Sequence, residues 1–212
     1  DVNGGASMSH TPLGLAAEKN NLDAMKLLID CGAGVDITGS LNRTALVYAV
    51  MNENVAAVKF LIEKGANVNA IDDRGPVLLK ANVEITELLI EAGADVNAGD
   101  TRNKRTILIH AAYGGDVEKM KLLIGAGANV NAKSTSGETA LMYAIRFHQK
   151  SPTDVVKLLI DNGAEVDAKD SKGITALMAA GMHGQIESMK LLIDAGADVN
   201  ATDQDGQTVI QL

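Results

Sequence analysis

The chain has 212 residues, of which 46% are apolar and only 2% aromatic, and its formal net charge is −8. These values permit a core of Leu, Ile, Val, Ala and Met, which suits closely stacked helices. The negative charge argues against a nucleic-acid partner, because proteins bind phosphate backbones chiefly through Lys and Arg. No apolar run approaches the roughly 20 residues that a membrane helix needs, so we expect no membrane insertion.

Cys31 is the single cysteine of the chain. One thiol excludes an internal disulfide framework and fits a reducing compartment. We therefore expect a cytoplasmic protein, with secretion of a longer parent protein as the open alternative. Cys31 directly precedes a glycine at a predicted helix end, where we expect a buried or half-buried structural residue.

Predicted helices recur in pairs along the chain. The first helix of a pair is short and Ala-rich, and a threonine precedes it as the expected N-cap. These threonines are Thr11, Thr44, Thr106, Thr139 and Thr175. The second helix carries apolar residues at helical spacing. Its sequences are MKLLID (25–30), VKFLIE (58–63), TELLIE (86–91), MKLLIG (120–125), VKLLID (156–161) and MKLLID (189–194).

A glycine follows each second helix, where a left-handed C-cap is expected. The six glycines are 28 to 36 residues apart and are Gly32, Gly65, Gly93, Gly127, Gly163 and Gly196. Asn and Asp residues come next and favour turns. One helix pair cannot bury its own apolar face, whereas a stack of pairs can, so the spacing indicates a solenoid.

The pattern resembles the ankyrin repeat family, whose unit of about 33 residues carries T-P-L-H-x-A. The clearest matches are TPL at 11–13 and TAL at 44–46, 139–141 and 175–177, and the phrases TALMYA and TALMAA are similar to those of bacterial members. The resemblance implies an all-α solenoid of antiparallel helix pairs with hairpin-like finger loops. The chain departs from the motif at its histidine, which is replaced by Gly14, Val47, Ile109, Met142 and Met178.

The spacing divides residues 1–212 into a single array. The repeats span about 8–37, 41–70, 74–98, 103–132, 136–168 and 172–201, with partial repeats at 1–7 and 205–212. The third repeat is shortened and the fifth contains an insertion. The last partial repeat would leave an apolar edge exposed, so we expect a section of a longer array or of a larger protein.

The residues that most often carry chemistry are dispersed over this array. The histidines are His10, His110, His148 and His183, and they fall at different places in different repeats. Packed helices lie about 8–10 Å apart, so we expect no convergence of these side chains on a metal, no catalytic residues and no cofactor. The chain is predicted not to be an enzyme.

The candidate partner-binding residues come from the two surfaces on which partners of this family dock. At the ends of the first helices these are Met51, Tyr113, Arg146, Phe147, Met182 and His183, residue types that are enriched at interfaces. On the finger loops they are Arg74, Arg102, Lys104 and Arg105. The alternative is that the first set packs on neighbouring repeats and the second is ordinary solvated loop.

The third repeat has a first helix reduced to about VLLKA after Pro76. Two interpretations are open. The deletion is drift that neighbouring repeats tolerate, or it leaves a notch between Met51 and Tyr113 that receives an acidic segment with an apolar anchor.

The turn asparagines also have two interpretations. In some ankyrin proteins the equivalent residue is hydroxylated, whereas a turn residue of this kind ordinarily bonds its own backbone. The residues concerned are Asn69, Asn97, Asn131 and Asn200.

The resemblance implies a scaffold, expected to be a monomer, that binds another protein through its concave face and finger loops. One alternative is a substrate-recruiting or regulatory section of a larger enzyme or secreted effector. A second alternative is a tether between membrane and cytoskeletal proteins.

Overall fold

The computed structural model describes residues 2–4, 10–147 and 152–211. It divides into two compact units, Asp1–Asp95 and Val96–Leu212, each of which is described by itself. No helix in the described part is both long and apolar enough to cross a membrane.

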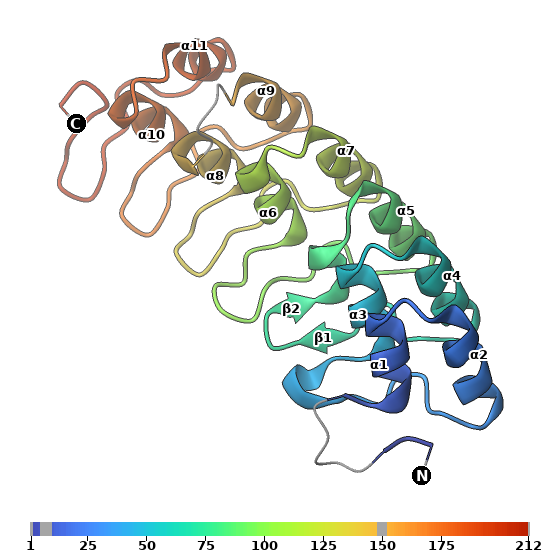
Figure 1. The fold of residues 1–212 in the computed structure, drawn as a ribbon. Coiled ribbons are helices and arrows are strands. Elements are labelled where there is room, and N and C mark those ends of the chain that lie inside the picture. The colour runs from blue at the N-terminus through green and yellow to red at the C-terminus, as the bar shows by residue number, and fades with distance from the viewer. Residues whose placement is uncertain (1, 5–9, 148–151, 212) are drawn as a thin grey trace. The chain divides into compact units, whose positions relative to one another are not determined.

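The first unit is built from helix pairs that stack through their shorter members. Its elements are α1 (Pro12–Glu18), α2 (Leu22–Asp30), η1 (Ser40–Asn42), α3 (Ala45–Met51), α4 (Val55–Glu63), β1 (Ile71–Asp72), β2 (Gly75–Pro76), η2 (Val77–Lys80) and α5 (Val83–Glu91). α1 packs on α2 and α3, α3 packs on α4 and η2, and α4 packs on α5 (Figure 1). The antiparallel strands β1 and β2 form a short finger hairpin.

The second unit repeats the same arrangement. Its elements are α6 (Ile107–Gly114), α7 (Val117–Gly125), α8 (Ala140–Phe147), α9 (Thr153–Asp161), α10 (Ala176–Met182) and α11 (Ile186–Asp194). The first helices α6, α8 and α10 pack side by side, and each also packs on the second helix of its own pair. The expectation of an all-α solenoid of stacked helix pairs is confirmed.

The predicted helix caps form at four of the five threonines. The Oγ1 atoms of Thr11, Thr44, Thr106 and Thr175 each accept a hydrogen bond from the backbone N–H three residues later. The prediction was wrong at Thr139, whose buried Oγ1 has no hydrogen-bond partner among the described residues. At the other end of the pairs, all six predicted glycines have φ between 82° and 89°, the left-handed conformation that glycine adopts at little cost.

Both helices of each pair contribute to the core, and the first helices bury the larger share of their residues. The leucine of each Thr-x-Leu motif is almost completely buried: Leu13, Leu46, Leu108, Leu141 and Leu177. The second helices bury less, and α2 buries only Met25. Cys31, the C-cap of α2, is exposed. The expectation that it would be at least half-buried was therefore wrong, because α2 packs through one narrow face.

The turn asparagines connect successive repeats instead of bonding their own turns. The Oδ1 atoms of Asn69, Asn97 and Asn131 accept hydrogen bonds of 2.7–2.8 Å from the backbone N–H groups of Asp95, Asn129 and Glu165. Asp36 and Asp167 make the same contact to the turns that follow them. The expectation of a bond to the residue's own backbone was wrong for Asn69 and Asn131. Each turn is held by its neighbour, so local turn chemistry also stabilises the stack.

The third first helix is the short 3-10 helix η2, with four residues where the other first helices have seven or eight. It buries Val77 and Leu78 and packs on α3. The last turn of α3, which ends at Met51, consequently has no α-helical counterpart in η2.

Candidate partner-binding surfaces

The ends of the first helices in the second unit carry a row of large, half-exposed side chains. Tyr113 is the penultimate residue of α6, and Phe147 and Met182 are the last residues of α8 and α10. The three side chains are 51%, 47% and 45% exposed. The ring centroids of Tyr113 and Phe147 are 5.6 Å apart, and Tyr143 supports Phe147 at 5.4 Å. Because α8 packs on both α6 and α10, these ends are adjacent. Ring contacts hold the aromatic side chains of this row in place, and their apolar surfaces remain accessible to a partner.

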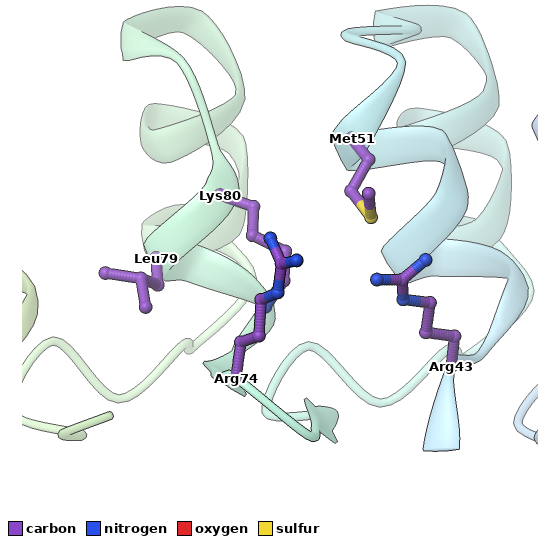
Figure 2. Close-up of a pocket in the computed structure, with 5 residues that line it drawn as sticks. All are labelled: Arg43, Met51, Arg74, Leu79 and Lys80. Carbon is purple, nitrogen blue, oxygen red and sulfur yellow. The ribbon is translucent and has the colours of Figure 1, made fainter. Parts of the chain in front are cut away.

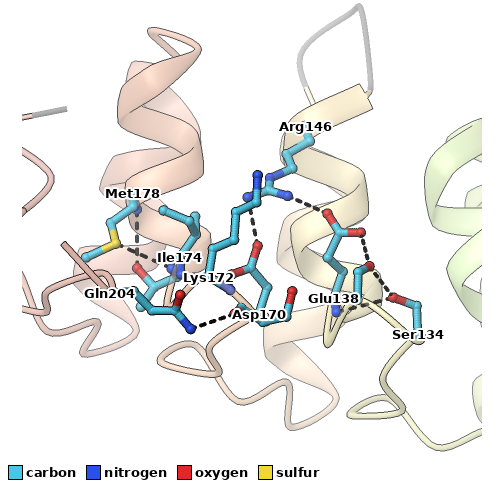
Figure 3. A network of polar contacts seen from close by, with 11 residues as sticks. Ser134, Glu138, Arg146, Asp170, Lys172, Ile174, Met178 and Gln204 are labelled. Carbon is cyan, nitrogen blue, oxygen red and sulfur yellow. Dashed lines mark hydrogen bonds and ion pairs between the residues drawn. The ribbon is translucent and has the colours of Figure 1, made fainter.

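Arg146 lies beside this row but is engaged within the protein (Figure 3). Its guanidinium pairs with Glu138 and, at 3.0 Å, with Oδ2 of Asp170 in the following finger. Glu138 also accepts a hydrogen bond of 2.7 Å from the hydroxyl of Ser136. Both carboxylates are buried, and the Arg146 side chain is only 21% exposed. The structure therefore gives Arg146 a role in joining two repeats.

His183, in contrast, is exposed at the C-terminal end of α10. It stands next to Met182 in the sequence and adds a polar edge to the row. Together the two residues place one apolar and one titratable side chain at the same helix end.

The finger that precedes α6 contains another buried carboxylate. Asp100 lies 2.9 Å from Nε of Arg105 and 2.9 Å from Nε2 of His110. Burial would raise the pKa of Asp100, but hydrogen bonds from the Asn103 backbone N–H, His110 and Arg105 outweigh it and lower the pKa to about 2. Burial lowers the pKa of His110, although Asp100 favours the protonated ring. Arg105 is therefore paired with a buried carboxylate of its own finger.

Arg102 and Lys104 are exposed on the same finger. Lys104 adopts a positive φ of 53°, which is uncommon for a residue with a side chain. These two cations are the accessible members of the set of Arg102, Lys104 and Arg105, which the sequence predicted for partner binding.

Replacing Asp100 by Asn should reduce stability in a pH-dependent way. A carboxylate whose pKa is lowered on folding stabilises the folded state above its unfolded pKa, and this contribution is lost as the pH falls through the folded pKa. The difference in unfolding free energy between wild type and Asp100→Asn should be about 2 kcal/mol at pH 7 and should shrink between about pH 4 and pH 2. Urea unfolding followed by circular dichroism at several pH values measures it.

Asp203→Asn is the matched control, because this finger carboxylate accepts hydrogen bonds from the backbone N–H groups of Asp205 and Gln207. It is in no ion pair among the residues that the structure describes. A pH dependence of the same size in both variants would contradict the role of the Arg105 and His110 partners.

The first unit contains a pocket between the end of α3 and η2 (Figure 2). It has a volume of about 360 Å³ and is lined by Arg43, Met51, Arg74, Leu79 and Lys80. Met51 and Arg74, two of the candidate partner-binding residues, are therefore in one site. Leu79 and Lys80 were missed as site residues. The shortened helix was the one signal in the sequence that pointed to this place.

The remaining histidines lie apart. His10 stands 3.6 Å from a carboxylate oxygen of Glu18 and stacks at 5.0 Å on Tyr48, whereas His148 is outside the described residues. No group of three His, Cys, Asp or Glu side chains with metal-binding geometry occurs in the described ranges.

Comparison with known proteins gives one consistent result. The family model described as ankyrin repeats in three copies matches residues 2–72, 77–170 and 147–212. Among solved structures, the ankyrin repeat domain of Bcl-3, a member of the IkappaB protein family, is 26% identical with a TM-score of 0.85, over 96% of this chain and 94% of that chain.

Two further solved structures are similar. An ankyrin repeat domain from Acinetobacter baumannii is 35% identical with a TM-score of 0.82, over 88% of this chain and 98% of that one. The ankyrin repeat domain of human ASB11 is 27% identical with a TM-score of 0.80, over 96% and 91%. No relative was found among curated proteins.

Proposed function

This chain belongs to the ankyrin repeat family, whose repeats generally mediate protein–protein interaction. We propose that it is a non-catalytic scaffold that binds one partner protein through the ends of its first helices and its finger loops. The observation that carries the proposal is the row of Tyr113, Phe147 and Met182. We include in the proposal that the protein acts as a cytoplasmic monomer. The exposed, unpaired thiol of Cys31 supports a reducing compartment.

Burying the row of Tyr113, Phe147 and Met182 against a partner is favourable compared with leaving it in solvent. Tyr and Met are enriched in the buried centres of interfaces, and aromatic anchors there commonly cost about 2 kcal/mol or more when truncated. Tyr113 and Phe147 contact each other through their rings, so their side chains lose less conformational freedom on binding than isolated residues would. This lowers the entropic cost of binding.

The double variant Tyr113→Ala, Phe147→Ala should weaken partner binding by at least about thirtyfold with little change in melting temperature. The wild type and the variant are used as baits with extract from the source organism. A protein that is enriched by the wild type and depleted with the variant is then purified, and its affinity for both is measured by calorimetry.

The matched control is Ile186→Ala, Ile193→Ala, which removes exposed apolar side chains from α11 in the same unit. This variant should bind as the wild type does. Equal loss in both variants, or unchanged affinity of the aromatic variant together with a clearly lower melting temperature, would show that the row is a packing feature.

A further inference from the structure

The pocket of the first unit is lined by more cationic side chains than the neighbouring carboxylate can neutralise. Three cations line it, Arg43, Arg74 and Lys80, and the buried carboxylate beneath them is Asp72. Asp72 accepts contacts of 3.3 Å from Nε of Arg43 and 2.9 Å from Nζ of Lys80. The guanidinium of Arg74 makes no ion pair among the described residues. The pocket therefore keeps a formal charge of about +2 within a protein of net charge −8.

The two guanidinium groups face each other. Figure 2 shows the side chains of Arg43, which lies just before α3, and of Arg74 on the finger, with their guanidinium groups pointing into the space between these elements. Like charges held in this way repel, and an anion placed between them would remove the repulsion and accept hydrogen bonds from both. The remaining wall is apolar, since Met51 and Leu79 line the same pocket and Met51 is 42% exposed.

Local contacts explain why the cations of the pocket stay in place and accessible. Asp72 is fixed on β1, where it also accepts a hydrogen bond of 2.9 Å from the backbone N–H of Arg74. Lys80 is restrained by Asp72 and by the carbonyl of Gly75, to which its Nζ donates at 3.2 Å. Because η2 ends after four residues, no further helical turn from this repeat covers the space next to Met51.

We propose that this pocket binds an aspartate or glutamate side chain of a partner polypeptide, with a large apolar residue beside it in the same segment packing on Met51 and Leu79. The proposal rests on the proposed function, because it identifies part of what the scaffold recognises. Two arginines match the two oxygens of a carboxylate. A free small anion would leave the apolar wall exposed, whereas a peptide segment uses both parts of the pocket.

Arg74 is the residue to change, because its loss leaves no buried carboxylate without a partner. A library of random short peptides displayed on phage is selected for binding to the wild-type protein. The enriched peptides should carry Asp or Glu within two residues of Leu, Ile, Met or Phe. A synthetic, fluorescently labelled copy of the most enriched peptide is then titrated with each variant, and the anisotropy gives Kd.

The affinity of that peptide should fall about ten- to a hundredfold for Arg74→Gln and by the same amount when its acidic residue is replaced by the amide. Met51→Ala should weaken it about tenfold. The matched control is Lys59→Gln, which removes an exposed cation from α4 in the same unit. This control should change Kd by less than about twofold.

Peptides without acidic enrichment, equal binding to wild type and Arg74→Gln, or the failure of any peptide to be selected would each overturn the pocket assignment. The scaffold function is judged separately, by the aromatic variants of the second unit and the native partner. A native partner that depends on Tyr113 and Phe147 but not on Arg74 would leave the proposed function intact and remove only the pocket.

Discussion

Replacing Arg146 by Leu should lower the free energy of unfolding by about 3 kcal/mol at neutral pH. Glu138 and Asp170 are 8% and 9% exposed, and both pair with this one guanidinium. In the variant both carboxylates stay buried, and the guanidinium that compensated their charges is gone. Removing one partner of a buried ion pair costs far more than removing an exposed charge.

Urea unfolding followed by circular dichroism measures the loss. Arg102→Leu, which removes an exposed arginine, should change stability by less than about 0.5 kcal/mol. Adding Glu138→Gln and Asp170→Asn to Arg146→Leu should recover part of the loss, because the uncompensated charges are then gone. A loss below about 1 kcal/mol for Arg146→Leu, or no recovery in the triple variant, would contradict the role assigned to this network.

Replacing Leu141 by Ala should cost about 3 kcal/mol of unfolding free energy. Leu141 is 1% exposed in α8, which packs on α6, α9 and α10. The cavity left by the shorter side chain is bounded by several helices, so collapse of any one of them cannot fill it. In a repeat array the loss falls on the mutated repeat and its contacts with neighbours.

Hydrogen exchange followed by mass spectrometry locates this effect and urea unfolding gives its size. Exchange should accelerate most in α6, α8 and α10, which share the affected packing. Leu27→Ala is the control, because that side chain is 65% exposed, and it should change stability by less than about 0.5 kcal/mol. Equal effects at the two leucines would mean that the first helices do not form the core.

Local sequence features were sufficient to predict the helix pairs and their ends. Threonine caps and left-handed glycines depend on a few adjacent residues, so Thr44 and Gly65 behave as expected. The exposure of Tyr113 and Phe147 was also predicted, because a residue at the end of a short buried helix leaves the packed layer. These properties need only the period of the repeat and the chemistry of one unit.

The pairing of polar side chains could not be predicted in the same way. Arg146 and Arg105 were chosen as partner-binding residues from their type and position, yet each is paired with a buried carboxylate. Asn69 was expected to bond its own turn, but its amide oxygen is used by the next turn. Ion pairing and hydrogen bonding depend on distances of a few ångströms, and a repeat period does not specify them.

The sequence by itself determined a stack of helix pairs with glycine-ended second helices, a shortened third repeat and apolar residues at the ends of first helices. Each of these follows from residue spacing and from conformational preferences that act over one or two turns. Only the tertiary structure decided which cations are neutralised and which are available. Arg43 and Lys80 meet Asp72 through the finger hairpin, Arg74 does not, and the space beside Met51 follows from how η2 packs on α3. Charge compensation requires the folded chain, because groups such as Arg43 and Asp72 are far apart in the sequence and meet only in the packed structure.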